Sequence, residues 1–120
     1  MDTITYTPSG QAMPEKTLPI PPEAFSAPGT SLYWLGGGGA LIVSRGTSIM
    51  IDPVLEGFDM PLLIDQPLTP EGVPSLDALL ITHVDNDHFS RPTCLDLKPV
   101  CKRYHAPRYL GTVLTGMGLP

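Results

Sequence analysis

Residues 79–90 read Leu-Leu-Ile-Thr-His-Val-Asp-Asn-Asp-His-Phe-Ser, and the rest of the chain is organised around this stretch. Its first four residues, Leu79 to Thr82, are apolar or β-branched and predict a short buried strand. Four side chains that can bind a metal ion follow within six residues: His83, Asp85, Asp87 and His88. The sequence therefore predicts a ligand-bearing loop at the end of a strand, where a rigid sheet can position it.

The types and spacing of these side chains predict two neighbouring metal sites. Imidazole nitrogen suits zinc and iron, and carboxylate oxygen suits harder ions or completes a mixed shell. In extended backbone, residues 83, 85 and 87 point to one side and His88 points elsewhere. His83 and Asp85 then serve one ion, and Asp87 and His88 serve the other. The alternative is an acidic surface turn with incidental histidines, but a strand leading directly into the ligands favours the metal sites.

Residues 79–90 resemble the His-x-His-x-Asp-His signature of metallo-β-lactamase-fold hydrolases, with Asp85 in place of the usual second histidine. A second stretch carries the same resemblance. Residues 33–43 read Tyr-Trp-Leu-Gly-Gly-Gly-Gly-Ala-Leu-Ile-Val, and residues 46–53 read Gly-Thr-Ser-Ile-Met-Ile-Asp-Pro. This stretch is similar to the opening of the branch with ascorbate-phosphate lactonase-like and phospholipase-D-like members. The two motifs stand in the family's order and spacing, and the resemblance extends from residue 31 to about residue 115.

The resemblance implies an α/β (α+β) fold, the N-terminal half of an αββα metallo-β-lactamase-type sandwich. It implies two divalent ions, zinc or manganese, the first held by His83 and Asp85 and the second by Asp87 and His88. Asp85 makes the first site richer in oxygen, which favours a harder ion such as manganese. Water activated by the ions would attack a lactone, a phosphodiester or a phosphorylated small molecule, with Asp87 as the catalytic residue that orients it. Asp52 would hold the metal loop from beneath.

The family's remaining ligands do not follow residue 88. A third histidine, a bridging aspartate and a final histidine are required, and the chain offers only Asp96 and His105 there, in unmatched contexts. His105 is expected to be structural or exposed. We expect the 120 residues to form the first half of a larger hydrolase, a fragment; the alternative is a catalytically silent metal-binding remnant or an interaction module. An uncovered sheet face predicts a homo-oligomer or pairing with a missing second half.

The patterns before the ligand loop predict a small antiparallel unit. Residues 31–35, 40–44 and 47–51 predict three strands, joined by a glycine turn at 36–39 and a tight turn at 45–46. The glycine run is not followed by Lys-Ser/Thr and leads into a strand, which argues against a phosphate-binding loop. In the resembled family this turn lies near the metal site.

The remaining segments predict less regular structure. Residues 1–30 contain six prolines and are expected to form an arm, with Ile20 and Phe25 as its anchors, beside the incomplete domain at 31–120. Residues 60–65 predict one short helical or extended piece. After the loop, the patterns predict a helix at 91–98 capped by Ser90, a strand at 100–105 and a helix at 107–114.

Composition limits the function classes. With 42% hydrophobic and 16% charged residues, the chain is expected to be one globular domain. Its net charge of −5 argues against nucleic-acid binding, and the basic residues between 91 and 108 predict a solvated face rather than an anion-binding patch. No apolar run reaches the ~18 residues of a membrane span, and no signal peptide is evident, so cytoplasm is expected. Cys94 and Cys101 lack Cys-x-x-Cys spacing and predict reduced structural thiols.

Overall fold

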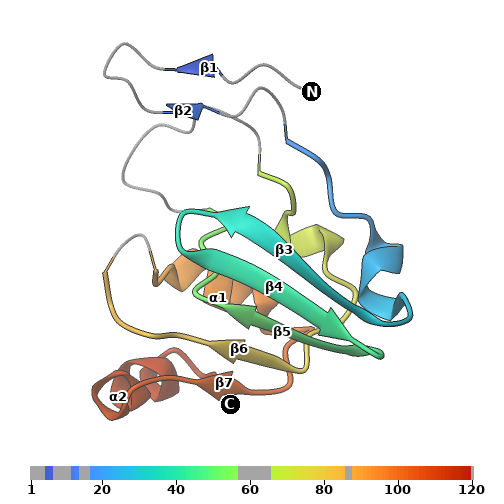
Figure 1. Ribbon diagram of the computed structural model, residues 1–120. Coiled ribbons are helices and arrows are strands. Elements are labelled where there is room, and N and C mark those ends of the chain that lie inside the picture. Colours follow the sequence, from blue (N-terminus) through green and yellow to red (C-terminus); the bar gives the residue numbers. More distant parts are fainter. Residues whose placement is uncertain (1–4, 7–11, 14–16, 57–65, 86–87, 120) are drawn as a thin grey trace.

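A five-stranded mixed sheet forms the frame of the chain (Figure 1). The computed structural model describes residues 5–6, 12–13, 17–56, 66–85 and 88–119. The strands are β1 (Thr5–Tyr6), β2 (Ala12–Met13), β3 (Thr30–Gly36), β4 (Gly39–Ser44), β5 (Thr47–Ile51), β6 (Ala78–Leu80) and β7 (Tyr104–His105). The helices are the 3-10 helices η1 (Pro22–Ser26) and η2 (Pro70–Gly72) and the α-helices α1 (Arg91–Leu97) and α2 (Arg108–Gly116). β1 and β2 pair with each other, antiparallel, in a separate two-stranded sheet.

The sheet has the strand order β3-β4-β5-β6-β7 and changes from antiparallel to parallel at β5. β4 and β5 form a hairpin through Arg45 and Gly46, whose φ angles of 50° and 83° suit a two-residue turn of the mirror-image type. β5, β6 and β7 run parallel, so the chain must cross over between them. The carboxyl ends of β5 and β6 therefore meet at one edge of the sheet.

Most of the predicted elements are confirmed, with two boundary corrections. The three strands before residue 52 and the two helices after residue 90 lie within two residues of their predicted bounds. The strand predicted at 79–82 ends at Leu80, because the backbone N–H of Thr82 donates to a side chain instead of a strand. The strand predicted at 100–105 is reduced to β7 and a separate bridge between Leu76 and Cys101. The two pairings are separate because Leu76 bonds to Val100 and Lys102, whereas the next N–H that donates to this segment is that of Leu79, to the carbonyl of Arg103.

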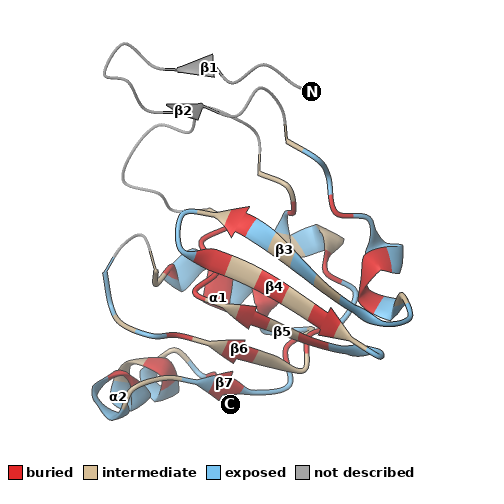
Figure 2. Ribbon diagram, viewed as in Figure 1, coloured by how far each residue is buried: buried red, intermediate tan, exposed pale blue. Residues whose placement is uncertain are grey.

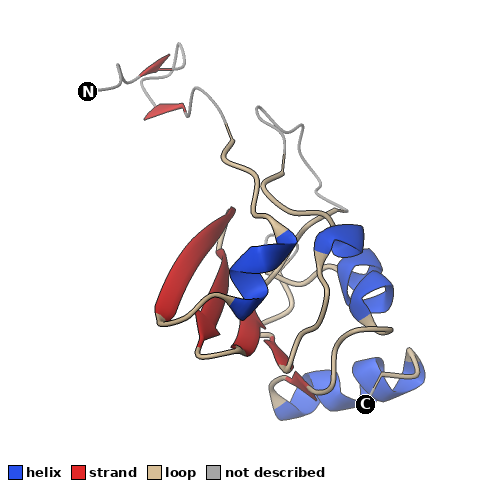
Figure 3. Cartoon of the chain, turned by 90° about the vertical axis from the view of Figure 1, so that its right-hand side faces the viewer, coloured by secondary structure: helices blue, strands red, loops and turns tan. Residues whose placement is uncertain are grey.

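The core lies between one face of the sheet and the helices (Figures 2 and 3). Successive side chains of a strand point to opposite faces of the sheet, so every second one points into this core. Those fully buried on the sheet include Leu35, Leu41, Val43, Met50 and Leu79. Ile20 and Phe25 are also buried in the same core, which confirms that they anchor the segment before β3.

The described chain is thus a small α/β domain with a five-strand mixed sheet and two α-helices. This confirms the predicted α/β class. The short piece predicted at 60–65 lies outside the described residues. Among the described helices, none has the length and apolar character needed to cross a membrane.

The two cysteines are free and buried, as expected for structural thiols, and they make stability sensitive to alkali. Burial, with a smaller effect from the neighbouring Cys101 thiol, raises the pKa of Cys94 from 9.0 to about 12. Between these values the unfolded chain loses the proton and the folded chain keeps it. The free energy of unfolding should therefore fall by about 1.4 kcal/mol per pH unit as the pH rises above about 9.

Urea unfolding at a series of alkaline pH values measures this loss of stability. A Cys94→Ala variant should show a shallower decline, and part of the decline should remain because burial also raises the pKa of Cys101. A free energy of unfolding that stays constant through this range would contradict the expected linkage.

Candidate metal centre

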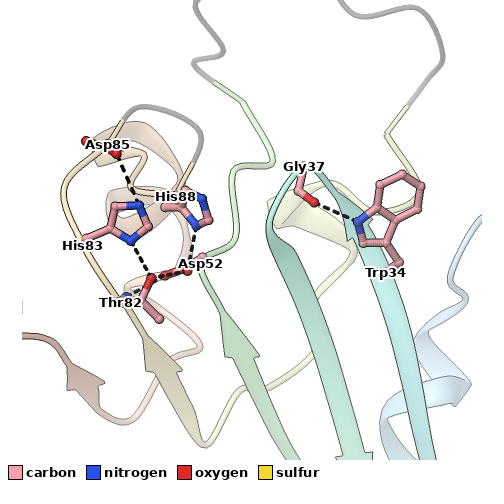
Figure 4. Close-up of polar contacts among 7 residues, drawn as sticks. All are labelled: Trp34, Gly37, Asp52, Thr82, His83, Asp85 and His88. Carbon is pink, nitrogen blue, oxygen red and sulfur yellow. Dashed lines mark hydrogen bonds and ion pairs between the residues drawn. The ribbon is translucent and has the colours of Figure 1, made fainter. Parts of the chain in front are cut away.

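Side chains from two parallel strands meet at the carboxyl-end edge of the sheet (Figure 4). Asp52 follows β5 directly, and Thr82 and His83 follow β6. The register pairs Ile51 with Leu80, and the N–H of Asp52 donates to the carbonyl of Leu80 at 2.8 Å. This pairing places Asp52 beside the start of the ligand-bearing loop. Open α/β sheets commonly bind ligands at such an edge.

Asp52 is a buried acceptor that organises the loop. Its side chain is 3% exposed, and its φ of 48° lies in the left-handed region, which Asp and Asn tolerate better than most residues. Oδ1 accepts the backbone N–H of Thr82 at 2.7 Å, and Oδ2 accepts the Thr82 hydroxyl. Oδ2 also lies 2.9 Å from Nδ1 of His88. Hydrogen bonds to an ionised acceptor are strong, so this carboxylate fixes two points of the loop.

These contacts determine which nitrogen of each imidazole carries a proton. A carboxylate only accepts, so Nδ1 of His88 must donate to Asp52. The Thr82 hydroxyl has one proton, which it donates to Asp52, and it therefore accepts from Nδ1 of His83 at 2.8 Å. In the neutral form of His88, Nε2 is then the nitrogen with the lone pair, whereas Nε2 of His83 faces the Asp85 carboxylate at 3.3 Å and pairs with it when the ring is protonated. Histidine ligands of metal sites are commonly oriented by such a contact on the opposite nitrogen.

The two imidazoles lie together, contrary to the expectation that His88 points elsewhere. Their ring centroids are 4.1 Å apart. The reason is a turn, in which the carbonyl of Asp85 accepts the N–H groups of His88 and Phe89 at 2.8 and 2.9 Å. The turn replaces the extended backbone on which the alternation depended and brings His88 back beside His83.

One donor atom each from Asp52, His83 and His88 lies within 4.8 Å of the other two, a grouping that can hold a metal ion. Asp85 stands at its solvent side, with Oδ2 3.3 Å from Nε2 of His83. Two ligands bonded at ~2.1 Å to one tetrahedral ion lie about 3.4 Å apart, so this separation suits a shared ion. Two imidazoles with carboxylates fit zinc, iron or manganese.

The structure thus places some of the predicted site residues together. The structure brings together His83, His88 and Asp52, and sets Asp85 against His83. Asp87, predicted as a ligand and as the catalytic residue, lies outside the described residues. His105, set aside as a ligand, is exposed on β7.

The glycine turn between β3 and β4 packs directly on the His88 ring. A Cβ atom added to Gly38 would lie 2.3 Å from Cε1 of His88, and one added to Gly39 would lie 3.0 Å from the carbonyl oxygen of Asp52. Only glycine allows this approach. The sequence predicts a turn between strands at this glycine run, and the family resemblance places that turn near the site. Nothing in the local pattern indicates contact with His88.

Helix α1 fixes the far end of the ligand loop. Ser90 caps the helix by accepting the N–H of Thr93 at 3.2 Å, as predicted, and its hydroxyl donates to the carbonyl of Glu56 at 2.8 Å. The buried hydroxyl of Thr93 accepts the N–H of Leu55 at 3.1 Å. The segment after Asp52 and the segment after His88 are therefore tied to the same helix, which holds both sides of the site.

No protein-family model matches the chain, and no curated protein is significantly similar to it. The resemblance to metallo-β-lactamase-fold hydrolases therefore rests on the two sequence motifs and stays a prediction. The described residues themselves support a candidate metal centre formed by Asp52, His83 and His88.

Proposed function

We propose that this chain carries the metal centre of a metal-dependent hydrolase that acts on a lactone, a phosphodiester or a phosphorylated small molecule. The observation that supports it is the buried Asp52 carboxylate, which orients His88 directly and His83 through Thr82. One nitrogen of each imidazole lies within 4.8 Å of the other and of an Asp52 oxygen, which is close enough for a shared ion. The single layer of helices on one face of the sheet is also what half of an αββα sandwich would present.

In this proposal each residue has a separate task. His83 and His88 hold a divalent ion through Nε2, with Asp85 as a further ligand from the solvent side. Asp52 orients the ring of His88 and, through Thr82, the ring of His83. The bound ion would supply Lewis acidity, which makes water a better nucleophile and polarises the scissile bond. The Asp85 side chain is 72% exposed, so among the described residues substrate would approach the centre from this side.

A second function is favoured by the number of donors. Among the described residues, His83, His88 and Asp85 amount to the ligands of one ion, whereas hydrolases that clamp both oxygens of a displacement use two ions. The alternative proposal is therefore a catalytically silent metal-binding module, to which an ion adds structure and no turnover.

Hydrolysis assays with bis(4-nitrophenyl) phosphate and γ-butyrolactone separate the two proposals. The purified chain would be assayed with Zn²⁺, Mn²⁺ or EDTA, beside His88→Ala and a matched control, His105→Ala. The hydrolase proposal expects turnover that requires metal, falls at least about 100-fold in His88→Ala and persists in His105→Ala. Metal binding without turnover supports the silent module. Failure to bind any of these ions would contradict both proposals.

A further inference from the structure

The sheet face opposite the helices is apolar and lies open among the described residues (Figures 2 and 3). The strand register aligns Leu32 with Ile42, Ile42 with Ile49, and Ile51 with Leu80 on this side. We call this surface the outer face and define it by six large side chains: Leu32, Trp34, Ile42, Ile49, Ile51 and Leu80. Leu32 is 71% exposed and Trp34 is 65% exposed, which is far more than large apolar residues of a sheet usually show.

The outer face carries no charge along the five strands of this sheet. Its remaining positions hold alanine, serine and threonine, with His105 at the β7 edge. Contact between two such faces would therefore bring no charged side chain of these strands against its own kind. Contiguous apolar patches of several hundred square ångströms on a soluble domain mark interaction sites.

We propose that two copies of this chain pack outer face against outer face to form a dimer. Sheets with apolar faces pack about 10 Å apart with their strands nearly aligned. The contact would bury the exposed Leu32 and Trp34, the exposed parts of the four half-buried side chains and a polar rim, and a standard interface buries ~800 Å² per partner. An uncharged surface of this kind is self-complementary, as an isologous dimer requires.

The distribution of bulk on the sheet favours one arrangement of the two copies. A two-fold axis that runs along β5, between the sheets, places β3 of one copy over β7 of the other and β4 over β6. β3 has seven residues and carries Leu32 and Trp34, whereas β7 has two residues and places only His105 on this face. The β3 edge of each copy, with its large side chains, would then lie over the β7 edge of its partner, which carries few.

Sedimentation velocity and the fluorescence of Trp34, the single tryptophan of the chain, test the dimer without involving the metal centre. The sedimentation coefficient should rise with protein concentration, and the Trp34 emission should move to shorter wavelength over the same range. Leu32→Lys should weaken the dimer at least about 100-fold, because the buried leucine enters an isologous interface twice. Leu95→Lys, which changes an exposed leucine on α1, is the matched control and should dimerise normally.

Circular dichroism of both lysine variants checks that they fold, and the high exposure of Leu32 makes the substitution compatible with the monomer. A chain that stays monomeric with solvent-exposed Trp34 emission at all concentrations would overturn the proposal. A dimer that survives Leu32→Lys with unchanged affinity would also overturn it, because the contact would then use another surface.

Discussion

Replacing Asp52 by asparagine is expected to lower the affinity for Zn²⁺ by at least about 100-fold while the chain stays folded. Asparagine tolerates the left-handed backbone at this position, where φ is 48°, so the change isolates the role of the carboxylate. Its amide can still accept the N–H of Thr82 through oxygen. The amide nitrogen then replaces Oδ2, which accepts from His88 and Thr82 in the native chain.

This exchange reverses the tautomer of His88. An amide N–H is a donor, so Nδ1 of His88 must become the acceptor and the proton moves to Nε2. The nitrogen that would bind the ion is then blocked. The loss of charge-assisted hydrogen bonds should also lower the free energy of unfolding by about 2 kcal/mol.

Competition titration with a chromophoric chelator measures the affinity, and urea unfolding measures the stability. Asp77→Asn is the matched control, because Asp77 accepts hydrogen bonds from Ser48 and Lys102 near the start of β6, away from the loop. The Asp77 variant should lose stability and keep its Zn²⁺ affinity. Equal Zn²⁺ affinities of the native chain and Asp52→Asn would contradict a role of Asp52 in metal binding.

Replacing Gly38 by alanine is expected to lower Zn²⁺ affinity by about 10- to 100-fold. The new methyl group would stand 2.3 Å from Cε1 of His88, and a normal contact requires at least ~3.4 Å. The ring or the turn must therefore move by about an ångström. A shift of that size misplaces Nε2 relative to the other donors, and metal sites depend on ligand positions within a few tenths of an ångström.

Gly111→Ala in α2 is the control for this change. A methyl group added there meets nothing within 4 Å, so metal affinity should be unchanged, and stability should rise slightly because alanine favours helix. The same chelator competition compares both variants. Native affinity in Gly38→Ala would show that the turn yields easily and that its contact with His88 does not position the ring.

Local sequence patterns predicted much of the fold. The strands before Asp52 are bounded by glycine turns, and α1 begins at a serine cap followed by proline, so their signals lie within a few neighbouring residues. The order of the parallel strands was not predictable from such patterns, because it depends on crossovers that pack against the core. The resemblance predicted an uncovered sheet face, but the Ala-Leu-Ile-Val run of β4 does not show which side of the sheet it is.

The candidate site divides in the same way. The ligand types in the loop after β6 and the motif position of Asp52 indicated a metal centre from the sequence. The proximity of the two imidazoles depends on the turn at Asp85, and the contact of Gly38 with His88 joins residues fifty positions apart in the chain. The turn is local and typical of such an Asp- and Asn-rich stretch, but the assumed extended backbone excluded it. The contact of Gly38 leaves no local signal, because it arises from how separate elements pack.

The most direct test of the metal centre is the long-range ¹H–¹⁵N NMR spectrum of the three histidines during titration with Zn²⁺. Before metal is added, His88 should show a protonated Nδ1 and an unprotonated Nε2 at a pH where it is neutral, because Nδ1 donates to Asp52. With Zn²⁺, the Nε2 resonances of His83 and His88 should shift together and saturate at one stoichiometry, while exposed His105 stays unchanged as the internal control. Unmoved resonances of His83 and His88, or an equal shift of all three histidines, would contradict a centre built on Asp52, His83 and His88.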